Sequence, residues 1–303
     1  MRIRISEALH SITGIPKLAP MVIKPDICFL RKHVEELVRY TRNPEHINEL
    51  NESAEYIRQE FKKLGLQVEE DVFNVDGREF KNLRVSFGPK TGERFIVGSH
   101  YDVYGDQPGA DDNASGIAGI LELARMLKES KIEPKTPLDL IAYTLEEGPY
   151  FQLGSGVHAD SLKKQGIKVK GMLTLEMIGY FSDKSYSQTY PLKPLKFIFP
   201  NKGNFIGLVG YNNSSLPLII KTQRAIGHHI PVQSLWWPWK LVRDMGRSDH
   251  GPYCDLGYPA LMVTDTANFR NPHYHSVGDQ IDTLDFEKMS NVVKGIYELI
   301  SKL

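Results

Sequence analysis

The stretch that decides the fold is RFIVGSHYD, residues 94–102. Its apolar run FIV is typical of a buried strand, and the run leads to His100. Since residues two apart on an extended chain point to the same side, Asp102 can lie behind His100. A carboxylate in that position can accept the second ring N–H of a metal-bound histidine and so fix its tautomer. This stretch predicts a strand that delivers a supported histidine to one edge of a sheet.

Strands and helices are expected to alternate along the rest of the chain. Other short apolar runs typical of strands lie at residues 66–73, 82–88, 138–145, 171–179 and 259–265. Helical spacing or small-residue runs predict helices at residues 30–41, 52–65, 113–130 and 291–303. The alternation predicts an α/β fold, a three-layer α/β/α sandwich with a mixed, mostly parallel central sheet.

Three of the predicted strands end in ionisable residues. His100 ends the first, Glu146 and Glu147 follow the second, and Glu176 ends the third. In such sheets, ligands bind beyond the carboxyl ends of the strands. We therefore expect these side chains to form one enzyme-like site at this rim.

Five short stretches offer the imidazole and carboxylate ligands that a hydrolytic zinc site requires. They are GSHYD (98–102), GADDNASG (109–116), EEGPYFQLGS (146–155), LEMIGY (175–180) and HYHS (273–276). Adjacent buried carboxylates are costly unless a cation or donor neutralises them. They can also divide the work, one binding metal while its neighbour takes a proton from metal-bound water.

With SDHGPY (248–253), these stretches in this order resemble the co-catalytic zinc aminopeptidase family, which also contains glutamate carboxypeptidases and glutaminyl cyclases. The resemblance runs from about residue 30 to the C-terminus and implies a zinc-exopeptidase fold with two zinc ions per chain. It assigns five ligands: His100 and Glu176 to one zinc, Glu147 and His275 to the other, and Asp111 as the bridge between them.

The resemblance also assigns the residues that act on these ligands. Asp102 would orient His100, Glu146 would be the general base, and the peptide bond between Asp111 and Asp112 would be cis. Glu176 departs from the pattern, because many members have aspartate there. Glutamate is still a hard oxygen ligand, so it should bind with shifted geometry or a different metal preference, and Co²⁺ or Mn²⁺ are alternatives to zinc.

These assignments predict an aminopeptidase that hydrolyses the first residue from peptides with a free N-terminus. A glutaminyl cyclase shares the fold and much of the motif set. A carboxypeptidase would need cations for a terminal carboxylate, which Arg243, Arg247 and Arg270 could supply. A binding module without metals is disfavoured because every expected ligand position holds a competent side chain. A serine triad at residues 248–250 is also disfavoured, since adjacent residues rarely reach triad geometry.

Composition narrows the partners and the location. Lysine plus arginine equals aspartate plus glutamate, 37 each, so no net field indicates nucleic acid or a membrane surface. Two cysteines fit a reducing compartment. We expect a cytoplasmic protein without a signal peptide, a possible homo-oligomer, and regard the C-terminal Ser301-Lys302-Leu303, a peroxisomal match, as fortuitous.

The expected organisation is an N-terminal extension (1–25) followed by one catalytic domain (26–303). Residues 181–247 are expected to be largely irregular and to form a lid or specificity insertion. This region holds all three tryptophans, within residues 235–239, as either a buried aromatic plug or a wall of the substrate pocket.

Overall fold

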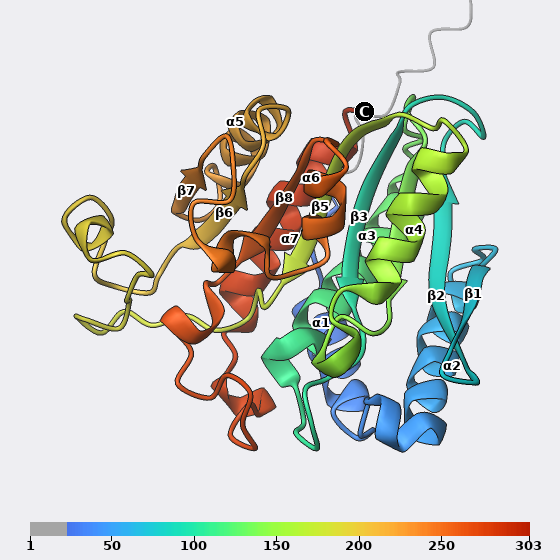
Figure 1. Ribbon diagram of the computed structural model, residues 1–303, viewed down its shortest axis with the longest axis horizontal. Helices are drawn as coiled ribbons and strands as arrows, with labels where there is room; N and C mark the ends of the chain where they lie inside the picture. Colours follow the sequence, from blue (N-terminus) through green and yellow to red (C-terminus); the bar gives the residue numbers. More distant parts are fainter. Residues whose placement is uncertain (1–22) are drawn as a thin grey trace, which may run out of the picture.

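The computed structural model describes residues 23–303, and Figure 1 shows them as a central sheet between layers of helices. The predicted extension, residues 1–25, therefore lies almost wholly outside the described part. Eight strands form the sheet: β1 (Glu69–Val75), β2 (Arg78–Phe87), β3 (Arg94–His100), β4 (Leu138–Tyr143), β5 (Val169–Glu176), β6 (Ile206–Gly210), β7 (Val232–Trp236) and β8 (Ala260–Thr264).

The sheet is mixed, as predicted, with the order β1-β2-β4-β3-β5-β8-β6-β7. Its centre is parallel, since β3 pairs in parallel with β4 and β5, and β5 with β8. The antiparallel pairs are β1 with β2, β2 with β4, and β6 with β8. The carboxyl ends of the four central strands consequently meet at one rim.

Helices cover both faces of the sheet. They are α1 (Ile27–Leu37), α2 (Ile47–Lys63), α3 (Gly116–Ser130), α4 (Leu153–Lys164), α5 (Ser215–Ile226), α6 (His250–Asp255) and α7 (Phe286–Ile300). Helices α1, α3, α5 and α7 contact one another in one layer, and α4 packs with α6 in the other. The three-layer prediction is confirmed.

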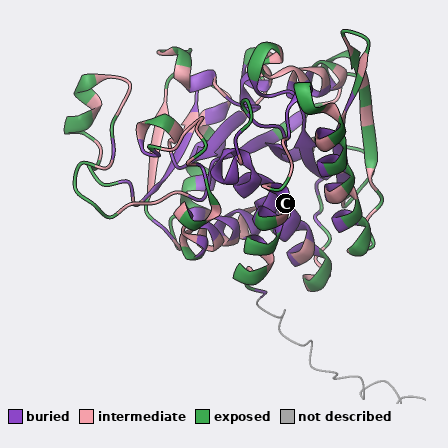
Figure 2. Ribbon diagram, turned by 90° about the horizontal axis from the view of Figure 1, so that it is seen from below, coloured by how far each residue is buried: buried purple, intermediate pink, exposed green. Residues whose placement is uncertain are grey.

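The alternation of side chains along β3 divides the core into two parts. Val97 joins the larger apolar cluster beneath α1, α3 and α7, whereas its neighbour Ile96 joins the smaller cluster beneath α4 and α6. Both are fully buried, as expected of a strand covered on both faces. Figure 2 shows this buried interior, with exposed residues concentrated on the helices and loops around it.

The region 181–247 is more regular than expected. Residues 177–205 contain only the short turn η4 (Lys193–Phe197) and form an arm that extends away from the body of the molecule (Figure 1). The rest supplies β6, α5 and β7, so it completes the central sheet. The apolar run of β6, IGLVG, is buried against β8, which explains why this part folds into the domain.

None of the helices within residues 23–303 combines the length and apolar character that a membrane span requires.

Candidate metal centre and adjoining pocket

The ends of three central strands bring the predicted ligands together. His100 is the last residue of β3, and Glu176 is the last residue of β5. Glu146 and Glu147 follow β4, in which Tyr143 is paired with His100. His275 comes from the loop that precedes α7, and Asp111 and Asp112 come from the turn that precedes α3.

Two histidines lie on either side of one carboxylate, that of Asp112. The Nε2 atom of His100 is 3.4 Å from Oδ1 of Asp112, and Nε2 of His275 is 3.2 Å from Oδ2. On the outer sides, His100 Nε2 is 3.4 Å from Oε2 of Glu176, and His275 Nε2 is 3.0 Å from Oε1 of Glu147. The arrangement is that of two adjacent three-residue groups that share Asp112.

The donor atoms of this cluster fit a pair of metal ions. Among the described residues, His100 Nε2 and both carboxylate oxygens of Asp112 are buried and have no hydrogen-bond partner. Ligand atoms of His100, Asp112 and Glu147 all lie within 4.8 Å of one another. Buried polar atoms normally have partners, so such a convergent set is suited to a cation, and nitrogen plus carboxylate oxygen is the donor set that zinc takes in hydrolases.

Asp111, predicted to be the bridging residue, does not occupy that position. Its Oδ1 accepts the backbone N–H of Gly179 at 2.9 Å, and its Oδ2 accepts the side-chain amide of Asn271 at 2.9 Å. The carboxylate thus ties three loops together instead of facing the histidines. The prediction is corrected to Asp112, and the cis peptide bond likewise lies one residue later than predicted, between Asp112 and Asn113.

Asp102 lies behind His100, but its backbone makes the closer contact. His100 Nδ1 is 3.1 Å from the Asp102 carbonyl oxygen and 3.6 Å from Oδ1. The carboxylate itself accepts the backbone N–H groups of Glu146 at 3.2 Å and Glu147 at 3.0 Å. Asp102 therefore links the end of β3 to the paired glutamates that follow β4.

The site carries an excess of buried negative charge. Burial and the neighbouring Glu147 raise the pKa of Glu146 well above its usual range. Burial and Asp112 raise the pKa of Glu147 to about 7. Burial alone would lower the pKa of His275, but its contacts with Asp112 and Glu147 raise it to about 9. These shifts express the same need for a cation that the unpaired atoms indicate.

Residues 248–250 do not form a serine triad. Ser248 donates its hydroxyl to Oε2 of Glu176 at 2.6 Å, and His250 Nε2 contacts the Met245 carbonyl at 2.8 Å. Between them, Asp249 is fully buried, and burial raises its pKa to about 7. The segment supports the Glu176 side of the cluster, in agreement with the sequence interpretation.

Tyr274 and Arg247 contact each other beside the cluster; Tyr274 had no predicted role, and Arg247 was considered only as a cation for a substrate carboxylate. The ring of Tyr274 stacks on that of His275 with centroids 3.8 Å apart, and its hydroxyl accepts Arg247 Nη2 at 2.9 Å. Tyr274 lies within the HYHS motif and precedes His275, and Arg247 directly precedes the SDHGPY motif. Adjacency was the available signal, but it does not show in which direction a neighbouring side chain points.

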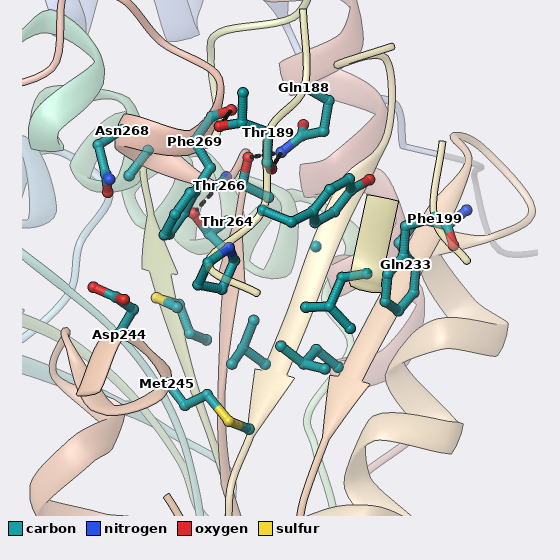
Figure 3. Close-up of a pocket in the computed structure, with 18 of the residues that line it drawn as sticks. Gln188, Thr189, Phe199, Gln233, Asp244, Met245, Thr264, Thr266, Asn268 and Phe269 are labelled. Carbon is teal, nitrogen blue, oxygen red and sulfur yellow. Dashed lines mark hydrogen bonds between the residues drawn. The ribbon is translucent and has the colours of Figure 1, made fainter. Parts of the chain in front are cut away.

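An apolar pocket opens beside Glu176 and Tyr274. It has a volume of about 860 Å³ including its open mouth, and Figure 3 shows the side chains that converge on it. Its floor comes from β6 and β8 through Leu208, Val209 and Met262, and one wall comes from the segment before α6, including Met245. The lining is predominantly apolar with a few polar groups at the edge, which is typical of a site for an apolar side chain.

The arm, residues 177–205, supplies another wall of this pocket. Leu195 and Phe199 line it, and the arm is fixed to the loop after β8 by hydrogen bonds visible in Figure 3. The side-chain amide of Gln188 donates to Thr266 Oγ1 at 2.8 Å, and Thr189 donates its backbone N–H to the Phe269 carbonyl at 2.8 Å. The arm is therefore docked onto the domain at the pocket.

The tryptophan segment follows neither interpretation offered by the sequence. Trp237 and Trp239 are 40% and 60% exposed, so they are not a buried plug. None of the three tryptophans lines the pocket, although Leu235 and Val242 on either side of them do. Trp236 is half-buried and donates its indole N–H to the Asn212 carbonyl at 2.8 Å.

Comparison with known sequences places this site in a known context. The model of "Peptidase family M28" matches residues 82–300. The Escherichia coli K12 protein named "Uncharacterized protein YfbL" is 39% identical over 287 residues, which cover 89% of this chain and 87% of that protein. "Leucine aminopeptidase 1" of Trichophyton rubrum is 29% identical over 70% of this chain, which spans about half of that protein (54%).

Solved structures have the same fold. LapB from Legionella pneumophila superposes with a TM-score of 0.71 at 24% identity, covering 91% of this chain and 71% of that chain. Porphyromonas gingivalis glutaminyl cyclase superposes with a TM-score of 0.69 at 17% identity, covering 91% and 97%. An aminopeptidase from Aneurinibacillus sp. strain AM-1 superposes with a TM-score of 0.68 at 18% identity, covering 91% and 93%. Because an aminopeptidase and a glutaminyl cyclase match the fold about equally well, the fold does not choose between these activities.

Proposed function

The chain belongs to peptidase family M28, and on that premise we propose that it is a metal-dependent aminopeptidase that removes the first residue from peptides with a free N-terminus. The observation that carries the proposal is the pair of histidines on either side of Asp112, with Glu176 leading directly into an apolar pocket. The residues fit two zinc ions: His100, Asp112 and Glu176 for one, and Asp112, Glu147 and His275 for the other.

Two zinc ions bound there would lower the pKa of a shared water and polarise the scissile carbonyl. The chemistry of the chain itself then centres on Glu146. Its carboxylate is buried beside Glu147, and its raised pKa suits a group that takes a proton and later gives it to the leaving amine. Asp102 accepts the backbone N–H groups of Glu146 and Glu147, so it fixes the position of the general base relative to the metal ligand.

The pocket supports a preference for peptides that begin with a large apolar residue. Its floor and walls are aliphatic and aromatic, and Glu176 lies at the end that adjoins the cluster. A substrate whose first side chain fills the pocket would place its α-amine near the Glu176 carboxylate and its first peptide bond near Glu147. This placement limits cleavage to the first residue.

The two alternatives fit the site less well. A glutaminyl cyclase binds an N-terminal glutamine, which needs polar partners that the apolar floor of this pocket does not offer. A carboxypeptidase needs an available cation. Arg270 is buried between Phe181 and Phe205 and donates to the Phe205 carbonyl, whereas Arg247 is engaged by Asp244 and Tyr274.

The test combines metal analysis with a small peptide panel. We expect two zinc ions per chain and release of leucine, methionine or phenylalanine from unblocked peptides but not from their N-acetylated forms. Activity should be lost with a chelator and return with zinc. One zinc per chain with ring closure of an N-terminal glutamine would replace the aminopeptidase by a cyclase, and cleavage of acetylated peptides would exclude both.

A further inference from the structure

The backbone of the turn that carries Asp112 is bound from two sides, by Asp279 and by Arg42. Asp279 takes the N–H groups. Its backbone carbonyl accepts Ala110 N–H at 3.2 Å, while its Oδ1 accepts Asp111 N–H at 2.9 Å and its Oδ2 accepts Asp112 N–H at 3.0 Å. Three successive N–H groups thus end on one residue, which fixes the orientation of the chain up to Asp112.

Arg42 takes the carbonyl groups of the same turn. Its Nη1 donates to the Pro108 carbonyl at 2.9 Å and its Nη2 to the Gly109 carbonyl at 2.8 Å. Its Nε donates to the carbonyl of Tyr101 at 2.9 Å, the residue directly after His100. The rigid planar fork of one guanidinium therefore sets the turn at a fixed position relative to the end of β3.

The use of a buried arginine in this way is unusual. Arg42 is fully buried, and its guanidinium donates hydrogen bonds to backbone carbonyl groups, those of Leu37, Tyr101, Pro108 and Gly109. A buried charge is costly, and proteins usually pair it with an opposite charge. Here its donors are used on main-chain carbonyls instead, next to the candidate metal ligands. Such an arrangement is explained if the geometry of the turn has to be held closely.

Gly109 allows the guanidinium to come this close. It has a φ of +60°, and a Cβ atom at this position would lie 2.8 Å from Arg42 Nη2 and 2.3 Å from the Asp112 carbonyl oxygen. Any other residue would be strained by its backbone and would push Arg42 away from the turn. The conformation of residue 109 and the contact of Arg42 are thus two parts of the same arrangement.

The two residues come from opposite ends of the chain. Arg42 lies between α1 and α2, outside the residues 82–300 that the family model matches. Asp279 follows His275 by four positions, on the loop that brings the second histidine to Asp112. The helical segment before β1 therefore has a direct link to the centre of the site.

We propose that Arg42 and Asp279 are positioning residues that hold the Asp112 carboxylate midway between His100 and His275, acting through the backbone of residues 108–112. This inference rests on the proposed function, in which Asp112 is a ligand shared by two metal ions. It assigns a role to the N-terminal helices that the aminopeptidase proposal does not need.

The experiment compares D279N and R42K with D139N as a matched control. In D279N, the NH₂ group of the asparagine replaces one carboxylate oxygen, so this donor would face the backbone N–H of Asp111 or Asp112. In R42K, the positive charge stays, but the planar guanidinium that donates to several backbone carbonyl groups at once is lost. Asp139 is also fully buried and binds Arg94, but at the opposite end of β3. Two quantities are measured for each protein: zinc affinity by chelator competition, and hydrogen exchange of the amides in residues 104–116.

We expect D279N and R42K to bind zinc roughly 10- to 100-fold more weakly, as is usual when a contact that supports a metal ligand is lost. Amides 110–112 should exchange faster than in the original protein. D139N should lower the melting temperature while leaving zinc affinity and exchange at 104–116 unchanged. Substitution by Co²⁺ should give an altered visible spectrum in D279N and R42K but not in D139N.

The proposal is overturned if D279N and R42K keep the exchange rates of the original protein at residues 110–112, or if D139N changes them as much. Failure of the proposed function has a different signature. In that case the original protein would bind no zinc and release no amino acid, whereas the exchange comparison, made without added zinc, would still decide whether Arg42 and Asp279 hold the turn.

Discussion

Each end of β3 has a fully buried carboxylate beside it, Asp139 at the amino end and Asp112 at the carboxyl end, but the two carboxylates have different partners. At the amino end, Arg94 Nη1 lies 2.8 Å from both oxygens of Asp139, and Ser86 adds a hydrogen bond at 2.6 Å. At the carboxyl end, His100 and Asp112 leave buried nitrogen and oxygen atoms unpaired among the described residues. The strand is seven residues long, so about 20 Å separates the two ends.

The difference shows which buried carboxylate is neutralised by the protein's own side chains and which depends on a bound ligand. The Arg94 guanidinium neutralises Asp139, so the buried charge at this end of the strand needs no ligand. The other end gathers carboxylates whose pKa values are raised by burial and by the neighbouring carboxylates. Burial alone therefore does not identify a functional site, whereas a convergent set of buried ligand atoms without partners indicates one.

The largest effect should follow from removing the proton acceptor at the carboxyl end. E146Q keeps the size of the side chain but cannot take a proton, so we expect kcat to fall on the order of 1,000-fold, within the range of general acid–base catalysis. Zinc content should stay at the original value. Steady-state kinetics with a leucyl substrate and metal analysis check this, and near-normal turnover would remove Glu146 from its proposed role.

The two adjacent aspartates offer the next test. D112N should weaken zinc binding by more than the roughly 100-fold expected from a lost supporting contact, because it removes a ligand shared by both ions. D111N should keep most of the affinity and instead lower the free energy of unfolding by about 1–3 kcal/mol, since its hydrogen bonds tie loops together. Chelator competition and urea unfolding distinguish the two. Equal loss of zinc in both variants would contradict the assignment to Asp112.

The amino end of β3 should respond in stability alone. D139N leaves the Arg94 guanidinium without its counter-charge, so we expect a loss of about 3 kcal/mol in the free energy of unfolding. Because the site lies at the far end of the strand, kcat at a temperature below the melting transition should not change. A fall in kcat at full folding would show that the two ends are coupled.

A smaller effect is expected from pH, and it should depend on metal. The pKa values of Glu147 and Asp249, raised to about 7, and of His275, raised to about 9, are all higher than those of the same residues in an unfolded chain. A group of this kind stabilises the fold at low pH and loses that contribution as pH rises through its folded pKa. The metal-free protein should therefore become less stable between pH 5 and pH 9.

Zinc should remove this pH dependence, because it stabilises the charged carboxylates and the neutral histidine. Melting temperatures at pH 5, 7 and 9, with zinc or with chelator, give the comparison. If the chelated protein is as stable at pH 9 as at pH 5, the carboxylates are not held in the way that the structure indicates.

Much of the fold could be predicted because its central strands have distinct sequences. The run at residues 94–100 was predicted with the bounds it has in the structure, since it is buried on both faces and begins and ends in polar residues. Strands β6 and β7 were not predicted, because each is only five residues long and contains glycine or polar residues. Their pairing with the sheet depends on β8, more than 20 residues further along the chain.

The cluster in the structure differs from the predicted ligand set at one residue, and the difference has a physical cause. Asp111 and Asp112 have the same side chain and are adjacent in sequence, so composition and spacing cannot show which one faces the histidines. The backbone of the turn decides this, and that backbone is held by Arg42, which lies 67 residues before Gly109, and by Asp279, which lies 167 residues after Asp112. Contacts over such distances leave no local signal.

The location of the tryptophans has a practical consequence for spectroscopy. All three lie in residues 236–239, at the end of β7, and the residues on either side of them form part of the pocket wall. The tryptophan fluorescence of this protein therefore originates from one small region. Within it, Trp236 is half-buried and Trp237 is exposed. Emission should shift when a ligand enters the pocket and report little on the histidine cluster, so fluorescence and metal analysis give separate readings of two neighbouring sites.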